Sequence, residues 1–437
     1  MDGVLEQLAP GLQRKQCARC GEEFGCAQGE PGCWCESVVL RRETLAELRT
    51  LADDCLCPTC LAAFAERDER YGGEANADGT RSGRTWAKAV PDAAIRSRGV
   101  PFVWGLCTLL FLIGSLLVAL AIGPISIGPI AIAESALGHL PWIHLHRLAT
   151  YEDEIVWLVR APRVVLAALV GGMLAIAGSA YQGVFRNPLA DPYLLGVAAG
   201  AGLGATVAIA YAPPASRGGE LLPLSAFVGA ILGVGCAYLL GRSVGVVRTS
   251  GTLILAGVTV AAFMTAAQTF VQQQHAQTLQ SVYSWLLGGF GSADWHDVFL
   301  VLPYIASSTS VLLLHRRVLD VLSLGDEEAG SLGVNIQRVR LVIVIAATVG
   351  TAAAVSVSGL IGFVGIIVPH AIRLLVSTSY RAVVPLSLLA GAGFLVLADV
   401  IARTVLSPAE LPVGVITAFF GAPFFAIVLR TTRRMAG

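Results

Sequence analysis

Long stretches of apolar residues, separated by short polar ones, fill most of this chain of 437 residues. Residues 341–372, for example, contain no Asp, Glu, Lys or Arg. A helix crosses the ~30 Å hydrocarbon layer of a membrane with about 20 apolar residues, so this run is long enough for two crossings. The break between them is predicted at Gly359 and Gly362, because glycine disfavours a continuous helix.

Ten uncharged stretches follow residue 100, and each is predicted to form one crossing. They lie near residues 102–122, 164–185, 193–212, 221–241, 251–274, 298–314, 341–358, 360–372, 383–398 and 411–429. Small residues are frequent in them, as in 171–180 and 196–205, and allow helix backbones to approach each other closely. The pattern predicts a tight bundle of about ten membrane-spanning helices.

Lysine and arginine are distributed unequally between the two sides of this predicted bundle. An even number of crossings puts both termini on one side. If that side is cytoplasmic, seventeen basic residues lie in the linker and inner loops, and five lie outside: Arg147, Arg160, Arg163, Arg217 and Arg403. Because cytoplasmic loops are enriched in Lys and Arg, we predict a multi-pass protein of the inner (plasma) membrane with cytoplasmic N- and C-termini.

The composition agrees with this pattern and limits the chemistry. Hydrophobic residues make up 55% of the chain and charged residues 14%, which excludes a soluble protein of this size. The net charge is zero, and we expect no nucleic-acid partner. Lysine occurs only at Lys15 and Lys88, so no phosphate loop of the form G-x-x-x-x-G-K-S/T can be written. We therefore expect a protein that is not an enzyme and that uses ATP only through partner subunits.

The start of the chain is polar and holds most of the cysteines. Eight of the ten are Cys17, Cys20, Cys26, Cys33, Cys35, Cys55, Cys57 and Cys60. No secretory signal opens the chain, so we expect this segment in the reducing cytoplasm, where clustered thiols bind metal more often than they form disulfides. C-x-x-C pairs suit tetrahedral thiolate coordination, and eight cysteines could close two four-cysteine zinc sites. A redox-active thiol pair is the alternative.

Composition divides the chain into three regions. Residues 1–70 are the predicted zinc-binding domain, whose core is so small that it would need the metal to fold. Residues 71–99 contain few large apolar residues and are predicted to be a flexible linker. Residues 100–437 form the predicted transmembrane domain.

From about residue 100 onward, several ordered blocks resemble the permease subunits of ABC importers for iron chelates, heme and vitamin B12, the FecCD-type family. They are R-x-P-R at 160–163, Q-x-x-x-x-N-P-L-A-x-P at 182–192, LILAGV at 253–258, WLLGGFGSADW at 285–295, GDEEAGSLGV at 325–334, GLIGFVGIIVPHAIR at 359–373, ADVIAR at 398–403 and ELPVGVITAFFGAPFF at 410–425. The block at 285–295 is similar to the vitamin B12 branch, although such short blocks are weak guides to substrate. At the other end, CARCGEEFGC, CWC and CLCPTCL resemble the small cysteine-rich CWC family over about residues 15–65.

The resemblance implies an all-α polytopic membrane protein with about ten transmembrane helices, the type II ABC importer permease fold, preceded by a small cysteine-rich cytoplasmic domain. It also implies a homodimer that works with two ABC ATPase subunits and an external substrate-binding protein. Such an assembly moves a metal chelate, namely vitamin B12, a ferric siderophore or heme, across the bacterial inner membrane into the cytoplasm.

Three groups of functional residues follow from the family resemblance. The ATPase coupling element is Gly325, Asp326, Glu327, Glu328, Ala329, Gly330, Ser331, Leu332, Gly333 and Val334, a polar segment that could otherwise be an ordinary interfacial turn. The cytoplasmic gate is Asn187 and Leu189, with Thr249, Ser250 and Gly251 as its second part, and its alternative is a simple proline turn. Docking of the binding protein falls to Arg160, Arg163 and Arg403, which could otherwise be exposed interface anchors.

The remaining predictions concern the histidines and an alternative to the importer function. We expect a structural role for His370, which follows Pro369, with a metal ligand as the alternative, and no metal at His144 and His146. An ion-coupled carrier or channel with a cytoplasmic metal-sensing domain is the alternative function. Carriers of this kind usually need buried ionisable groups, and only Asp399 and His370 come close to the predicted spans, which weakens that alternative.

Overall fold

In a computed structural model, the chain separates into two compact units, Met1–Arg96 and Ser97–Gly437. The structure describes residues 13–17, 20, 23–26, 44, 48, 56–57, 60–61, 64, 100–123, 128, 132, 135, 150–213, 220–243, 250–331 and 335–435. We call the first unit the cysteine unit and the second the membrane unit. The predicted linker, 71–99, lies outside the described residues.

The described part of the membrane unit is helical, which confirms the predicted all-α fold. Its elements are α4 (Phe102–Ala121), α6 (Thr150–Glu154), the π-helical segment η3 (Ile155–Arg160), α7 (Ala161–Phe185), the 3-10 turn η4 (Pro192–Leu195), α8 (Val197–Tyr211), α9 (Leu221–Ser243), α10 (Ser250–Gln274), the 3-10 turn η6 (Ala276–Thr278), α11 (Leu279–Leu286), α12 (Trp295–Leu324), α13 (Asp326–Ser331), α14 (Ile336–Ser358), α15 (Val364–Leu375), α16 (Tyr380–Thr404) and α17 (Val413–Met435).

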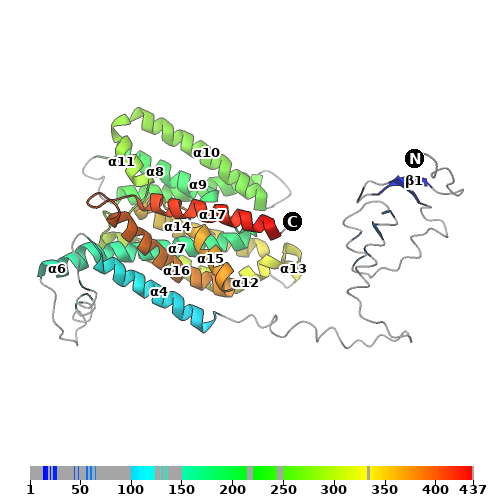
Figure 1. The fold of residues 1–437 in the computed structure, drawn as a ribbon. Helices are drawn as coiled ribbons and strands as arrows, with labels where there is room; N and C mark the ends of the chain where they lie inside the picture. The colour runs from blue at the N-terminus through cyan, green and yellow to red at the C-terminus, as the bar shows by residue number, and fades with distance from the viewer. Residues whose placement is uncertain are drawn as a thin grey trace, which may run out of the picture. The chain divides into compact units, whose positions relative to one another are not determined.

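Ten of these helices correspond one to one to the ten predicted crossings. Among the described residues, seven helices are long and apolar enough to span a membrane. Three shorter apolar helices, Val197–Tyr211, Val364–Leu375 and Val413–Ala426, account for the remaining stretches. Successive helices run in alternate directions along the bundle, with α13 at one end and α11 at the other (Figure 1). We call these the α13 end and the α11 end.

α7 forms the centre of the bundle because its surface consists of small and apolar residues. It packs against α16, α14, α12 and α15 and is buried along almost its whole length. A Cβ atom on Gly178 would overlap the carbonyl oxygen of Gly365 in α15, and one on Gly171 would overlap that of Gly391 in α16. Only glycine permits these approaches, as the small residues of 171–180 predict.

A non-helical junction separates α14 from α15 at the predicted break. Gly359 ends α14 with φ 68°, a conformation that favours glycine. The amide of Gly289 donates to the carbonyl of Ser358 at 2.8 Å, and the amide of Val413 donates to the carbonyl of Gly288 at 3.0 Å. We call residues 287–289, 358–361 and 413–414 the glycine junction. Its backbone groups bond to one another, as non-helical backbone inside a membrane bundle requires.

The cysteine unit contains a short hairpin in its described part. Strand β1 (Gln13–Gln16) pairs antiparallel with β2 (Glu23–Cys26), with Gln13 opposite Cys26. A small cluster of buried residues, Cys17, Leu56, Cys57 and Phe64, forms the core of the described residues. Half of this cluster is cysteine, so apolar packing alone gives this unit little stability.

Candidate functional site

The predicted coupling element forms a short helix of its own, α13. Gly325 precedes it with φ 150°, a conformation that favours glycine. Ala329 is fully buried, and its amide donates to the carbonyl of Gly325 at 3.1 Å. The structure does not describe the side chains of Glu327 and Glu328, and residues 332–334 of the predicted element lie outside the described residues.

Asp326, the first residue of α13, joins this helix to the bundle. Its carboxylate forms an ion pair with Arg186 at the end of α7 and accepts a hydrogen bond of 2.9 Å from Arg340 of α14. Arg186 also donates through Nε to the carbonyl of Leu322 in α12, at 2.9 Å. These charges are partly exposed, so each pair stabilises the protein by about 1 kcal/mol or less. Their significance is geometric, because any displacement of Asp326 acts on α7 and α14 together.

Arg186 stands directly before the predicted gate residue Asn187. It ends α7 in the left-handed conformation, with φ 49°. The Oδ1 atom of Asn187 accepts a hydrogen bond from the amide of Leu189 at 2.9 Å, which fixes the turn that follows, as Asn side chains commonly do. The arginine bound to the coupling helix and the asparagine that shapes the predicted gate are therefore consecutive residues.

The rest of this loop is tied to the glycine junction. The hydroxyl of Tyr193 donates to the carbonyl of Ile361 at 3.0 Å and accepts from the amide of Ile361 at 3.1 Å. Asp191 accepts from the amide of Tyr193 at 2.8 Å. Burial raises the pKa of Asp191 to about 6, although the hydrogen bond from Tyr193 acts in the opposite direction.

The second predicted gate segment precedes α10. Thr249 lies outside the described residues, whereas Ser250 and Gly251 begin α10. This helix packs against η4, and a Cβ atom on Gly257 would overlap the carbonyl oxygen of Leu194. The structure therefore brings the helix that follows the second gate segment against the loop that contains the first.

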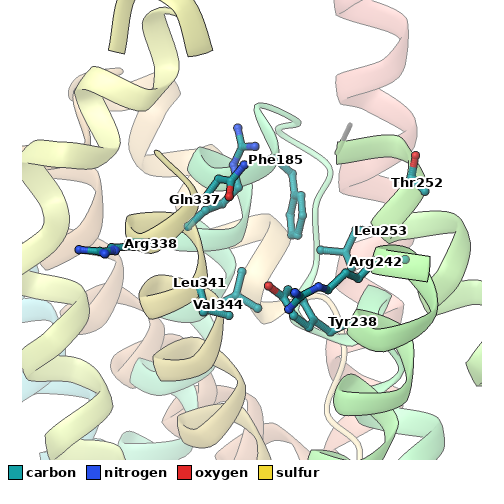
Figure 2. Close-up of a pocket in the computed structure, with 11 residues that line it drawn as sticks. Phe185, Tyr238, Arg242, Thr252, Leu253, Gln337, Arg338, Leu341 and Val344 are labelled. Atoms are coloured by element: carbon teal, nitrogen blue, oxygen red, sulfur yellow. The ribbon is translucent and has the colours of Figure 1, made fainter. Parts of the chain in front are cut away.

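A cavity of about 450 Å³ opens between α9, α10 and α14 near these segments. Figure 2 shows Tyr238 and Arg242 reaching from α9 toward Leu341 and Val344 of α14. Phe185, the last residue of α7, lines it as well. The sequence did not single out this cavity, because its walls come from four separate helices.

The three arginines predicted to dock a binding protein are not exposed. Arg160, Arg163 and Arg403 are between 4% and 9% exposed, so the exposure that the prediction assumed is wrong. Arg163 bonds to the buried carboxylate of Asp399 at 2.8 Å and to Glu410 at 2.9 Å. Arg160 donates to the carbonyl of Leu120 at 2.7 Å, and Arg403 donates to a carbonyl of α4. The guanidinium groups of Arg163 and Arg403 neutralise Asp399, because buried charges need partners. Those of Arg160 and Arg403 hold α4 against η3 and α16.

Four of the eight predicted metal ligands come together in the cysteine unit. The sulfur atoms of Cys17, Cys20, Cys57 and Cys60 lie within 4.8 Å of one another. Burial and hydrogen bonds with the neighbouring thiols raise the pKa of Cys60 to about 12. Of the other four, Cys26 is described only by its backbone in β2, and Cys33, Cys35 and Cys55 lie outside the described residues.

The four sulfur atoms fit a tetrahedral metal ion. Zinc–sulfur bonds of about 2.3 Å place tetrahedral ligands about 3.8 Å apart, and the sulfurs of Cys20 and Cys57 are separated by 3.6 Å. The pairs Cys17–Cys20 and Cys57–Cys60 are the two C-x-x-C motifs of the sequence.

The described residues place no cysteine or acidic ligand beside His370, whose ring lies edge-on to Phe424 at 5.8 Å. His144 and His146 lie outside the described residues.

Comparison with known proteins identifies the membrane unit. The model of the FecCD transport family matches residues 109–431, and that of the cysteine-rich CWC family matches residues 17–62. The chain belongs to the FecCD transport family. It therefore has the fold of a type II ABC permease, with a CWC domain at its N-terminus, as the sequence motifs indicate.

Proteins similar to this chain are named for different cargoes or for none. The chain is 43% identical to an uncharacterized ABC transporter permease protein of Bacillus subtilis, over 63% of this chain and 78% of that protein. It is 42% identical to the cobalamin import system permease protein of Halobacterium salinarum (63% and 73%) and 38% identical to the hemin transport system permease protein of Yersinia pestis (64% and 85%). A solved chain described as a metal-chelate type ABC transporter, in an inward-facing conformation, matches with TM-score 0.66 and 28% identity, over 76% of this chain and 100% of that chain.

The residues that sequence reasoning missed are the partners of the predicted ones. Arg186 and Arg340 counted only as basic residues of inner loops, yet both bind Asp326. Asp320 of α12 accepts a hydrogen bond from Ser379 at 2.8 Å and so holds the start of α16. Of these residues, only Arg186 could have been noticed from the sequence, because it lies inside the family block at 182–192.

Proposed function

We propose that this chain is the permease subunit of an ABC importer that brings a metal chelate into the cytoplasm and is driven by separate ATPase subunits. The observation that carries the proposal is the contact of Asp326 with Arg186, because it links the helix expected to meet an ATPase with the loop expected to form the gate. Membership of the FecCD transport family supports it. The α13 end is then cytoplasmic, in agreement with the basic residues of the inner loops.

In the proposed mechanism, nucleotide-driven closure of the ATPases displaces α13. Asp326 transmits this displacement to Arg186 and Arg340, and Arg186 pulls on the turn that Asn187 and Leu189 form. The same loop is bonded through Tyr193 to the glycine junction, so a shift at the gate reaches the segment between α14 and α15. Packed helices that have two stable arrangements convert such a small displacement into a change from one arrangement to the other.

The cargo is proposed only as a class. The relatives are named for cobalamin and hemin import, and vitamin B12, a ferric siderophore and heme all belong to the class of metal chelates. We also propose that the permease works as a homodimer with two ATPase subunits and an external binding protein. The division into residues 1–70, 71–99 and 100–437 and the gate and coupling residues stay part of this proposal.

For docking of the binding protein we keep Arg163 alone. Its partner Glu410 has a side chain that is 46% exposed, so an acidic residue of a binding protein could replace that carboxylate at Arg163. Arg160 and Arg403 bind buried carbonyl groups instead. Glu410→Gln should then tighten binding at low salt, because the competing carboxylate is gone. Unchanged affinity would remove Arg163 from the docking site.

The importer proposal is tested by purification and uptake with the ABC ATPase subunits of the same organism, each co-expressed with this chain. We expect the two proteins to purify together and cargo uptake to require ATP hydrolysis. Replacement of residues 326–334 by a Gly/Ser loop should abolish uptake. Uptake that survives this replacement, together with failure to retain any ATPase, would favour the carrier or channel instead.

The contact of Asp326 with Arg186 is tested by charge exchange. Arg186→Asp and Asp326→Arg should each lower the amount of cargo moved per ATP hydrolysed, and the double variant should recover part of it. Arg317→Asp, at an exposed position of α12, is the matched control and should leave this ratio unchanged. Equal ratios in all variants would show that the pair has no role in coupling.

We propose that Cys17, Cys20, Cys57 and Cys60 hold one zinc ion, which would stabilise the cysteine unit. The full-length protein should contain at least one zinc per chain, and Cys57→Ser should remove one equivalent. Cys236→Ser, at an exposed and isolated cysteine of α9, is the control and should retain the full zinc content. A metal-free wild-type protein whose thiols exchange reversibly with a disulfide would support the redox-active pair instead.

A further inference from the structure

The cavity between α9, α10 and α14 has the size and composition of a ligand site. Its volume, about 450 Å³, lies within the range of ordinary small-molecule pockets. Leu253, Leu341 and Val344 provide apolar walls, and Tyr238 provides a hydroxyl group. A pocket of this kind accepts a ligand with one apolar and one polar part.

The charged residues that line the cavity determine which polar group of a ligand it would bind. Arg242, Arg338 and Arg340 belong to its lining, and none of the described residues that line it carries a carboxylate. Only Arg340 has an acidic partner among the described residues, and that partner, Asp326, is shared with Arg186. Figure 2 shows that Arg338 points away from the space, so Arg242 is the guanidinium group that faces it directly. An excess of positive charge between apolar walls favours an anion.

The surroundings of the cavity indicate where this anion comes from. Leu341 lines the cavity and is also 37% exposed on α14, and its neighbours Val342 and Ile345 are more exposed still. On α9, Leu239 is exposed next to Tyr238. In a membrane bundle these exposed apolar side chains face acyl chains, so the cavity adjoins lipid at the end of the bundle where basic residues are concentrated.

We infer that this cavity binds the phosphate headgroup of an anionic phospholipid. Arg242 donates to the phosphate, Tyr238 is placed to bond the headgroup, and one acyl chain lies along Leu341. Basic pockets between transmembrane helices recognise anionic headgroups in this way. The cavity lies within one chain, between helices of the same subunit.

The test measures which lipid the detergent-purified protein retains. In native mass spectrometry we expect retention of phosphatidylglycerol and little retention of phosphatidylcholine. Arg242→Gln should weaken phosphatidylglycerol binding about fivefold, the effect of one basic residue near an anionic headgroup. Arg317→Gln, an exposed arginine of α12 near the α13 end, is the control and should bind like the wild type.

A second variant and a second ligand separate the alternatives. Leu341→Trp should fill the cavity and reduce binding without any change of charge. Inorganic phosphate and glycerol phosphate should not raise the melting temperature at concentrations where phosphatidylglycerol does. Equal loss in the two arginine variants would indicate general surface charge, and equal stabilisation by free phosphate would indicate a soluble anion. Either result would overturn the lipid site.

Discussion

Two polar side chains in the loop 187–196 fix the backbone conformation of the predicted gate. Asn187 and Asp191 each bond a backbone amide two residues ahead, so the loop is shaped by its own side chains. Asp191 differs from Asn187 because its side chain is ionisable and its pKa is raised to about 6 by burial. The loop therefore contains a group whose charge changes close to physiological pH.

This residue gives a pH dependence with a definite sign. The folded protein binds the Asp191 proton more tightly than the unfolded chain, whose Asp pKa is about 3.9, so a rise in pH through the window from about 4 to 6 lowers the free energy of unfolding. Asp191→Asn keeps the acceptor for Tyr193 and removes the titration. Between pH 5 and 7.5 the wild type should lose about 1 kcal/mol relative to the variant. Thermal unfolding in detergent measures this, and identical pH profiles would contradict it.

At the scale of residues, the sequence predicted positions better than partners. The family blocks singled out Asp326 for the coupling element and Asn187 for the gate, and both roles stay predictions. The sequence did not predict that Arg186 connects them, because that contact depends on how α7 ends and where α13 lies. The burial of Arg163 was missed for the same reason: its partner Asp399 is 236 positions away.

At the scale of elements, the bundle is held by close helix crossings at glycines. α7 meets α15 at Gly178 and Gly365, and α8 meets α9 at Gly200 and Gly229, with backbone against backbone at both crossings. Helices in lipid gain little from the hydrophobic effect, so close packing of this kind supplies much of their association.

The crossing of α7 with α15 gives a prediction for stability. Gly178→Ala adds a methyl group against the Gly365 backbone, which cannot move aside as a flexible side chain could. Overpacking of this kind costs about 1–3 kcal/mol, so the melting temperature should fall by several degrees. Gly235→Ala in α9 meets nothing within 4 Å and should leave stability unchanged or raise it slightly. Equal melting temperatures for the two variants would show that the crossing tolerates a larger residue.

The ten spans could be predicted because hydrophobicity is a local property of the sequence. The lengths of α8 and α15 could not, since each begins after a non-helical segment fixed by contacts with distant elements. For α15 that segment is bonded at Ser358 to the amide of Gly289, and for α8 it is the loop tied by Tyr193. Glycine at 359 predicted the break, but its bonding partners come from tertiary structure.

At the scale of the whole molecule, the even number of crossings returns the chain to the side where it entered. The basic residues then decide which side that is. In the predicted topology, seventeen Lys and Arg residues fall on the side of the termini, against five on the other side. Translocation of so many basic residues is unfavourable, so the termini and α13 should face the cytoplasm.

Reporter fusions measure this orientation. Green fluorescent protein joined after Gly437 should fluoresce, and alkaline phosphatase at the same place should be inactive, because each reporter folds on only one side of the membrane. A phosphatase fused after Ala409, in the segment between α16 and α17, should be active. The reverse pattern would contradict the assigned sidedness and place α13 out of reach of any ATPase.

The glycine junction changes how a mutational scan of this protein should be interpreted. Gly288, Gly359 and Gly414 each face a backbone carbonyl that a Cβ atom would strike, while neighbouring Leu360 contributes to the junction mainly through its backbone. Substitution of the three glycines would abolish transport as completely as loss of a gate residue, although none of them need touch cargo. A cluster of intolerant positions here reports the geometry of the backbone, so tolerance alone does not identify cargo contacts at the glycine junction.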